Sequence, residues 1–356
     1  MSRINPNRRR MAATILFFLS ATVSAQTAKK WDLFLLFGQS NMAGAPAAEA
    51  QDKTTNPRIK ALAFNNCTGK TFNQWYVASP PLHGCNEGLG PGDYFAKTLI
   101  DTSDKLELGI DTIGLIPCAI SGVDISYFSK GVTSSRRKDF KIPPVDSGVS
   151  AYLWMVTRIK EAQKKGVVRG ILFHQGESDW TDTARKAWPG RVETILKNLK
   201  ADCGLGDVPF LAGELRHQLN RTTNESCCYA HNTYVAQLAS EVPNGGVVSS
   251  ANLTGLNDAY HFDAASQRIF GHRYAAAMVP LLKKTMSVDP SARSILLGLR
   301  LESTSNGLMV RSETALDRVS LVSIQGKESV VGSGKDVRIL PGQFHPGIYF
   351  LRYYAF

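Results

Sequence analysis

The stretch that decides the fold is residues 33–42, which reads LFLLFGQSNM. Its five leading apolar residues predict a β-strand buried on both faces, because a strand with one face in water alternates apolar and polar residues. The strand ends at Gly38 and is followed at once by Gln39 and Ser40. Open α/β sheets bind ligands at the carboxyl ends of their strands, so Ser40 stands where a nucleophile would be held. From this stretch alone, Ser40 could equally well be a residue that only caps a helix.

Residues 30–285 continue this alternation of apolar strand-like runs and amphipathic helix-like segments. Further strands are predicted at residues 110–116, 167–173, 208–215 and 246–250. Two intervening helices are predicted from apolar residues that share one face, Val149, Leu153, Val156 and Ile159 in the first and Val192, Ile195, Leu196 and Leu199 in the second. Strands that alternate with helices predict a parallel sheet covered on both faces, which is a three-layer α/β/α domain.

Two long stretches, 44–90 and 126–148, interrupt the pattern and show little periodicity. Loops of this length in a compact domain usually have a functional role or are mobile. Both follow strands at the edge that would carry the site, so we expect them to wall a substrate groove. Trp75 and Trp180 are candidates for stacking on sugar rings, although burial in the core is the commoner fate of a tryptophan.

The first 25 residues have the pattern of an export signal. Arg3 and residues 8–10 give a basic start, residues 12–23 are mostly apolar, and Val23-Ser24-Ala25 supplies a small-residue cleavage site. The apolar run is too short for a membrane-spanning helix, and no later stretch is long enough. We therefore expect a soluble, secreted or cell-surface protein that passes through the periplasm.

The pattern of apolar and polar residues changes after Asp289-Pro290. Residues 295–356 contain short alternating runs separated by turns, which predict an antiparallel β module at residues 291–356 beside a main domain at 26–288. The module resembles the C-terminal sorting modules of some secreted bacterial enzymes, which implies a partner in the secretion machinery. A generic β-sandwich appendage and a carbohydrate-binding module are the alternatives.

Charge and cysteine content narrow the class of protein. Loss of the four arginines in residues 1–25 would lower the formal net charge from +11 to +7. The excess is spread along the chain, and residues 136–138 form the only short basic cluster, so no nucleic-acid-binding stripe is present. Export permits disulfides.

Six cysteines allow several pairings. Cys67 with Cys85 is one expected pair, and Cys203 is expected to pair with Cys227 or Cys228. Cys118 lies in an apolar strand and is predicted to be a buried free thiol. None of the spacings suits a zinc site.

Polar loops follow the predicted strands. The second strand leads to Gly122, where a backbone N–H can approach a substrate closely, and the third leads to residues 174–180, HQGESDW. A serine nucleophile needs a base within hydrogen-bond reach and an acid that orients the base. His261 is the preferred base, because Asp258 lies three residues earlier on the same loop. A helix follows, with Asp263 as its cap and a buried face formed by Phe270, Tyr274, Met278 and Leu281.

Three motifs carry a family resemblance. Residues 38–42 (GQSNM), residues 174–179 (HQGESD) and the pair Asp258 and His261 resemble the signatures of carbohydrate esterase family six. This is the acetylxylan esterase and sialate O-acetylesterase-like branch of the SGNH/GDSL hydrolases. Residues 88–92 and 115–119 match two further family stretches. The resemblance covers residues 30–285 and implies a flavodoxin-like SGNH fold.

The resemblance also implies catalytic roles. Ser40 would be the nucleophile and His261 the general base, with Asp258, or Glu177 instead of or beside it, as the orienting acid. The oxyanion would be held by the Ser40 N–H, a backbone N–H near Gly122 and the side-chain amide of Gln175. Residues 121–124 read SGVD, where the family commonly shows two glycines and a threonine, so the second donor stays open.

The expected substrate is an acetylated polysaccharide or oligosaccharide bound by Gln39, Asn41 and Trp180. The export signal and the β module favour plant polysaccharide, above all xylan. A sialate or other glycan O-acetylesterase is an alternative, as is a non-catalytic glycan-binding protein on the same fold. Neither a metal nor an organic cofactor is implied.

Overall fold

The computed structural model describes residues 30–106, 108–132, 150–217, 228–288, 299–304, 307–323, 328–340 and 349–355. A seven-stranded sheet has the strand order β3-β2-β4-β1-β5-β6-β7. Its strands are β1 (Trp31–Gly38), β2 (Ile59–Leu62), β3 (Trp75–Val77), β4 (Ile113–Pro117), β5 (Gly166–His174), β6 (Phe210–Gly213) and β7 (Gly245–Val248). All neighbours run parallel except β3, which pairs antiparallel with β2 at one edge.

Strand β1 lies in the middle of the sheet, between β4 and β5. Leu33, Leu35 and Phe37 point into the core on one face, and Phe34 and Leu36 into the core on the other. All five side chains are completely buried. The strand predicted from the apolar run is therefore confirmed, with both faces covered.

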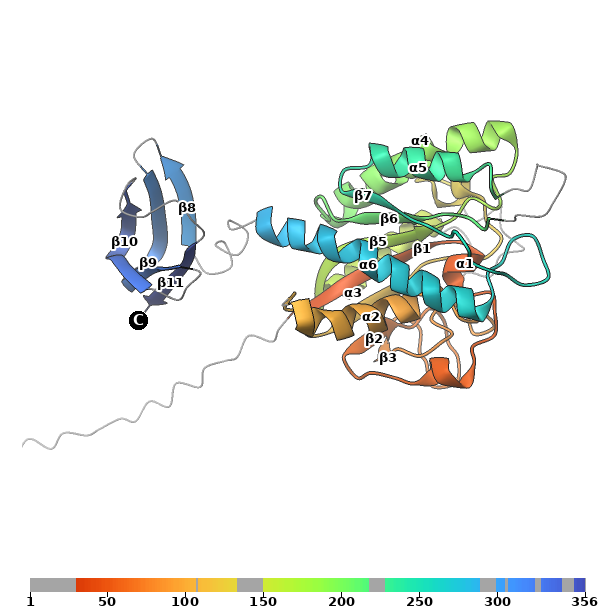
Figure 1. The fold of residues 1–356 in the computed structure, drawn as a ribbon, viewed down its shortest axis with the longest axis horizontal. Coiled ribbons are helices and arrows are strands. Elements are labelled where there is room, and N and C mark those ends of the chain that lie inside the picture. Colours follow the sequence, from red (N-terminus) through yellow and green to blue (C-terminus); the bar gives the residue numbers. More distant parts are fainter. Residues whose placement is uncertain are drawn as a thin grey trace, which may run out of the picture.

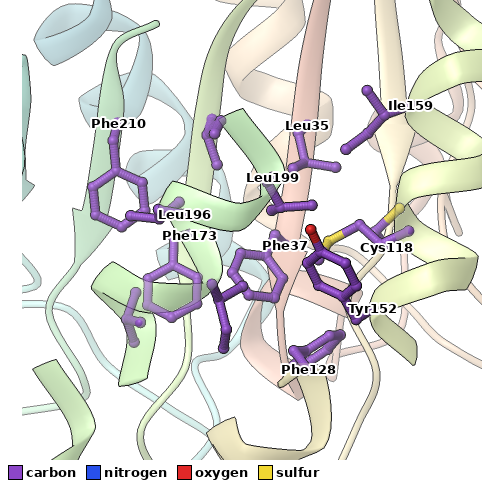
Figure 2. Packing of buried hydrophobic residues seen from close by; sticks show 14 of the residues in the cluster. Leu35, Phe37, Cys118, Phe128, Tyr152, Ile159, Phe173, Leu196, Leu199 and Phe210 are labelled. Atoms are coloured by element: carbon purple, nitrogen blue, oxygen red, sulfur yellow. The ribbon is translucent and has the colours of Figure 1, made fainter. Parts of the chain in front are cut away.

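Helices form a layer on each face of this sheet (Figure 1). Helices α2 (Pro91–Leu106) and α6 (Ala264–Val288) contribute to the core on one face, and α3 (Ala151–Gln163), α4 (Asp182–Cys203) and α5 (Asn232–Glu241) to the core on the other. Figure 2 shows the second core, where Leu35 and Phe37 of β1 pack near Leu196 and Leu199 of α4. The predicted three-layer α/β/α domain is confirmed.

The predicted helix faces are correct in part. The face of α4 is buried as expected. In α3, however, Leu153 is exposed, and the buried face runs through Tyr152, Met155 and Ile159. The helix is buried over most of its circumference, so apolar spacing alone was a poor guide to its outward side. On α6 it is Leu282, rather than the partly buried Leu281, that enters the core.

The predicted loop at 44–90 contains regular structure that the sequence did not reveal. It holds the 3₁₀ turn η1 (Ala50–Lys53) and the strands β2 and β3, which are too short to show a clear period. The Trp75 ring packs edge-on against Trp31 at a centroid distance of 5.0 Å, and both rings are partly buried against the core. A second 3₁₀ turn, η2 (Ile125–Phe128), follows β4, and residues 133–149 of the other long loop lie outside the described residues.

The cysteine predictions are also correct only in part. Cys67 and Cys85 form the expected disulfide, and Cys118 is a buried free thiol. The pairing predicted for Cys203 is wrong, because this residue is a free thiol on the buried side of the last turn of α4. Cys228 does take part in a disulfide.

A second, four-stranded antiparallel sheet forms the C-terminal module. Its strands are β8 (Leu299–Thr304), β9 (Gly307–Ser323), β10 (Glu328–Ile339) and β11 (Tyr349–Ala355). Two of the predicted alternating runs, residues 308–310 and 319–322, belong to the single long strand β9. The export signal and the turns at 305–306, 325–327 and 346–347 fall outside the described residues. In the part of the chain that the structure describes, no helix has the length and apolar character needed to cross a membrane.

One buried cation ties the sheet to the loop that precedes β3. Arg158 of α3 is completely buried, and its guanidinium donates to four oxygens. These are the carbonyls of Leu62 at 2.8 Å, Ala63 at 2.9 Å and Pro117 at 3.2 Å, and the side-chain oxygen of Asn73 at 2.7 Å. Arginine suits this position because it presents five donors in a fixed plane and keeps its charge.

Arg158→Ala is expected to lower the free energy of unfolding by about 3 kcal/mol or more, since it leaves several buried acceptors unpaired and opens a cavity. Denaturant unfolding measures the effect. Lys160→Ala, at an exposed position two residues along the same helix, is the control and should change the free energy of unfolding by less than about 0.5 kcal/mol. Equal effects of the two variants would contradict this role of Arg158.

Candidate active site

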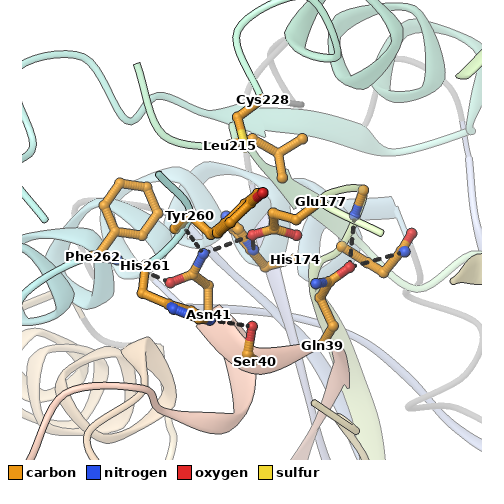
Figure 3. A network of polar contacts seen from close by, with 12 residues as sticks. Gln39, Ser40, Asn41, His174, Glu177, Leu215, Cys228, Tyr260, His261 and Phe262 are labelled. Carbon is orange, nitrogen blue, oxygen red and sulfur yellow. Dashed lines mark hydrogen bonds and ion pairs between the residues drawn. The ribbon is translucent and has the colours of Figure 1, made fainter. Parts of the chain in front are cut away.

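The carboxyl end of β1 brings Ser40 to the loop that carries His261. Ser40 begins the short helix α1 (Ser40–Ala43). A side chain on Gly38 would place its Cβ 2.0 Å from the carbonyl oxygen of His174, so only glycine lets the ends of β1 and β5 approach this closely. The Oγ of Ser40 lies 2.9 Å from Nε2 of His261 (Figure 3). This is the contact that a serine nucleophile makes with its general base.

Asp258 holds the other side of the histidine ring. Its Oδ2 lies 2.9 Å from Nδ1 of His261, and its Oδ1 accepts the backbone N–H groups of His261 at 2.7 Å and Tyr260 at 2.8 Å. Burial opposes ionisation, but these hydrogen bonds outweigh it and lower the pKa of the Asp258 carboxyl. An ionised Asp258 fixes the proton on Nδ1 and leaves Nε2 free to accept the Ser40 proton.

An open pocket of about 750 Å³ surrounds this pair. Two aromatic residues at the pocket, Trp180 and Tyr260, are 62% and 46% exposed. The pocket is lined by Gln39, Ser40, Ser121, Gly122, Glu177, Ser178, Trp180, Tyr260 and His261. Gln39 and Trp180, two of the residues expected to bind substrate, thus both line the pocket that contains Ser40 and His261.

Glu177, the alternative candidate for the triad acid, lies away from Nδ1 of His261. Its Oε1 accepts Nδ2 of Asn41 at 2.6 Å and lies 3.5 Å from Nδ1 of His174. Among the contacts of the described residues, neither of its oxygens pairs with His261, whose Nδ1 contacts Asp258. The geometry thus assigns the orienting position to Asp258 and places Glu177 in a neighbouring buried network.

Asn41 is completely buried, so it does not face the pocket as a substrate-binding residue would. Its Nδ2 donates to Glu177 and to the Tyr260 carbonyl at 2.9 Å, and its Oδ1 accepts the Phe262 N–H at 3.1 Å. Figure 3 shows Asn41 between these groups. The side chain therefore holds both neighbours of His261 in place.

Asn41→Ala is expected to lower kcat by at least about tenfold and stability by about 1–3 kcal/mol, because it frees the His261 loop and leaves the buried Glu177 carboxylate without its donor. Activity and thermal unfolding are measured together. Asn198→Ala on α4 is the matched control, and a variant of Asn41 as active and stable as this control would contradict the positioning role.

Gln175 does not reach the pocket, contrary to its predicted place in the oxyanion hole. It is 1% exposed, and its Nε2 donates towards Asp179 at 2.7 Å, Gln39 at 3.1 Å and the Val123 carbonyl at 3.3 Å. Its Oε1 accepts the Trp188 indole N–H at 2.5 Å. Both polar ends are therefore occupied within the protein.

The loop around Gly122 is held by two acids that sequence reasoning missed. Gly122 lines the pocket with φ of +75°, a backbone conformation that favours glycine. The neighbouring Ser121 donates to Glu87 at 2.8 Å, and Asp179 accepts the Ile125 N–H at 2.9 Å. Burial raises the pKa of Glu87, and it raises that of Asp179 to about 6. Asp179 stood in a recognised motif, whereas nothing in the sequence marked Glu87.

A serine, histidine and aspartate in this order of contacts, at the carboxyl end of a central parallel strand, define the geometry of a serine hydrolase. The chain belongs to the family described as carbohydrate esterase, sialic acid-specific acetylesterase, whose model matches residues 30–280. It is thus a carbohydrate acetylesterase by family, which agrees with the resemblance carried by the three motifs at that level.

Known relatives agree with this placement. A protein of Arabidopsis thaliana named Probable carbohydrate esterase is 26% identical over 259 residues, which cover 69% of this chain and 89% of the relative. The solved structure of the Arabidopsis thaliana protein aligns with a TM-score of 0.55 at 24% identity, over 71% of this chain and 99% of that one.

Two more distant structures share the fold. NanS aligns with a TM-score of 0.55 at 17% identity, over 72% of this chain and 98% of its own. A carbohydrate acetylesterase from Xanthomonas citri aligns with a TM-score of 0.54 at 17% identity, over 90% of this chain and 74% of its own.

Proposed function

We propose that this protein removes acetyl groups from acetylated polysaccharide, with xylan as its substrate, through an acetyl-enzyme formed on Ser40. The observation that carries the proposal is the chain of contacts from Ser40 to His261 to Asp258 at the floor of an open pocket. A non-catalytic glycan-binding protein would have no need of a serine placed 2.9 Å from a histidine that an aspartate orients.

The reaction would proceed in two halves. His261 Nε2 takes the Ser40 proton as Oγ attacks the acetyl carbonyl, and it then returns this proton to the sugar oxygen as the acetyl–sugar bond breaks. Water enters, gives a proton to His261, attacks the acetyl carbon and releases acetate as Oγ is reprotonated. Asp258 stays ionised and stabilises the positive charge that forms on the ring.

The character of the pocket supports a neutral polysaccharide over a sialic acid. The exposed rings of Trp180 and Tyr260 offer faces on which sugar rings can stack, and an open pocket admits a long chain. No lysine or arginine is among the described residues that line it, while the carboxyl groups of Glu177 and Asp258 lie close by.

The test is acetate release from acetylated xylan, acetylated glucomannan, acetylated pectin and O-acetylsialic acid, each with wild type and with Ser40→Ala. The proposal expects acetylated xylan to be the best substrate and O-acetylsialic acid a poor one. Fastest release from O-acetylsialic acid would instead favour the sialate O-acetylesterase alternative. Equal release by the two proteins from every substrate would favour a non-catalytic glycan-binding protein.

We also propose that residues 1–25 direct export and that the C-terminal module serves sorting or anchoring at the cell surface. The basic and apolar pattern of the N-terminus supports the first part. Fractionation of cells that express the full chain, or the chain ended after residue 288, tests both. Mature protein that begins at Gln26 is expected outside the cell, and equal distribution of the two forms would remove the role of the module.

A further inference from the structure

The side chain of Gln39 is held at one end only. Its Oε1 accepts three N–H groups, from Nε2 of Gln175 at 3.1 Å and from the backbones of Gly176 and Ser178 at 3.3 Å each. All three donors belong to the loop that follows β5. Figure 3 shows the Gln39 side chain beside Ser40.

These donors fix which way the amide points. Backbone N–H groups can only donate, so the atom of Gln39 that faces them must be the oxygen. The nitrogen is thereby directed to the other side of the amide. Gln39 is 3% exposed, but unlike Asn41 and Gln175 it lines the pocket, together with Ser40 and Gly122. Among the residues that the structure describes, its side-chain hydrogen bonds all involve Oε1, and Nε2 has no partner. An amide donor therefore faces the space in which Ser40 attacks.

Gln175 supplies no such donor. Its two N–H groups have three acceptors within the protein, Asp179, Gln39 and Val123, and its oxygen accepts from Trp188. A donor that is already paired inside the protein would have to break a buried hydrogen bond to reach an oxyanion.

We propose that Nε2 of Gln39 is the side-chain donor of the oxyanion hole, and that Gln175 is a positioning residue that holds Gln39. The proposal rests on the proposed esterase function. When the Ser40 Oγ–carbon bond forms, the carbonyl π electrons move to the oxygen and the Ser40 proton moves to His261. Gln39 then donates to the new negative oxygen. When the bond from the acetyl carbon to the sugar oxygen breaks, the carbonyl re-forms and this hydrogen bond weakens.

The test compares Gln39→Glu with Gln237→Glu. The first substitution keeps the acceptor oxygen and the size of the side chain but replaces the donor with a negative oxygen, and the second makes the same exchange on α5, away from the site. Gln39→Glu is expected to lower kcat on the order of 10²- to 10³-fold with KM changed by less than about threefold, because the lost bond is made only in the transition state. Gln237→Glu is expected to match the wild type.

A second variant, Gln39→Met, removes the donor without adding charge and should lower kcat to a similar extent. Thermal unfolding of each variant shows whether it has folded. Gln39→Met and Gln175→Met each remove buried hydrogen bonds, so both are expected to lower the melting temperature as well as kcat. Normal kcat in folded Gln39→Met would overturn the proposal.

Covalent labelling by an alkyl fluorophosphonate separates this proposal from the choice of substrate. Ser40 Oγ displaces fluoride from phosphorus while His261 takes the proton, and the phosphoryl oxygen gains charge in the oxyanion hole. The labelling rate should fall at least about tenfold in Gln39→Met. If wild type is labelled but releases no acetate from any glycan, the proposed function fails and the labelling rates alone decide the role of Gln39. A wild type that is not labelled at all would overturn both.

Discussion

Ser40→Ala is expected to lower kcat for p-nitrophenyl acetate on the order of 10⁶-fold, to the rate that binding and oxyanion stabilisation alone can support. The reason is that Ser40 Oγ, which lies 2.9 Å from Nε2 of His261, is the proposed nucleophile. Loss of one partly buried hydroxyl at the edge of an open pocket should leave the fold intact, so thermal unfolding should match the wild type. The measurement is the steady-state release of p-nitrophenol.

Ser240→Ala on α5 is the matched control and should keep full activity. It removes a hydroxyl from an exposed serine that donates only to the Gln237 carbonyl. Ser40→Ala with wild-type turnover would mean that the serine only caps α1, which was the competing interpretation of the opening stretch.

Asp258→Asn is expected to lower kcat by about 10⁴-fold, whereas Glu177→Gln should cost less than about tenfold. An asparagine amide facing Nδ1 would favour the wrong tautomer of His261, with the proton on Nε2, where it blocks acceptance of the Ser40 proton. Glutamine at position 177 keeps an oxygen for the Asn41 amide and lies away from the ring. Both variants are nearly the same size as the native residues, so kcat compares the two acids directly.

A larger loss from Glu177→Gln than from Asp258→Asn would assign the triad acid to Glu177. In that case the Asn41, Glu177 and His174 contacts would have to rearrange when substrate binds. Thermal unfolding of both variants accompanies the kinetics, because Glu177 is buried and its replacement also tests the packing of its loop.

The architecture of the main domain could be predicted from the sequence because the strongest signals were local. A run such as 33–37, buried on both faces, predicts a central strand, and a polar loop after each strand predicts where the site lies. The pairing of Asp258 with His261 could also be predicted from the sequence, since the two residues are three positions apart in one loop. Strands β2 and β3 escaped prediction because three or four residues are too few to establish a period.

The placement of the motif amides depends on contacts between distant segments. Gln175 and Asn41 stand in the recognised motifs, and their residue types are those of donors to substrate. Whether an amide faces a pocket or a neighbouring loop is decided by three-dimensional packing. Here the Gln175 amide hydrogen-bonds to Asp179 and Trp188, and the Asn41 amide to Glu177. The motif sequence is therefore compatible with either Gln39 or Gln175 as the oxyanion donor.

Covalent labelling is the most direct test of whether His261 activates Ser40 as a nucleophile. Wild type, Ser40→Ala and His261→Ala are exposed to an alkyl fluorophosphonate, and the adducts are located by peptide mass spectrometry. We expect one adduct per chain on Ser40 in the wild type, none in Ser40→Ala and a labelling rate reduced by several orders of magnitude in His261→Ala. An adduct on another residue, or labelling of His261→Ala at the wild-type rate, would contradict it.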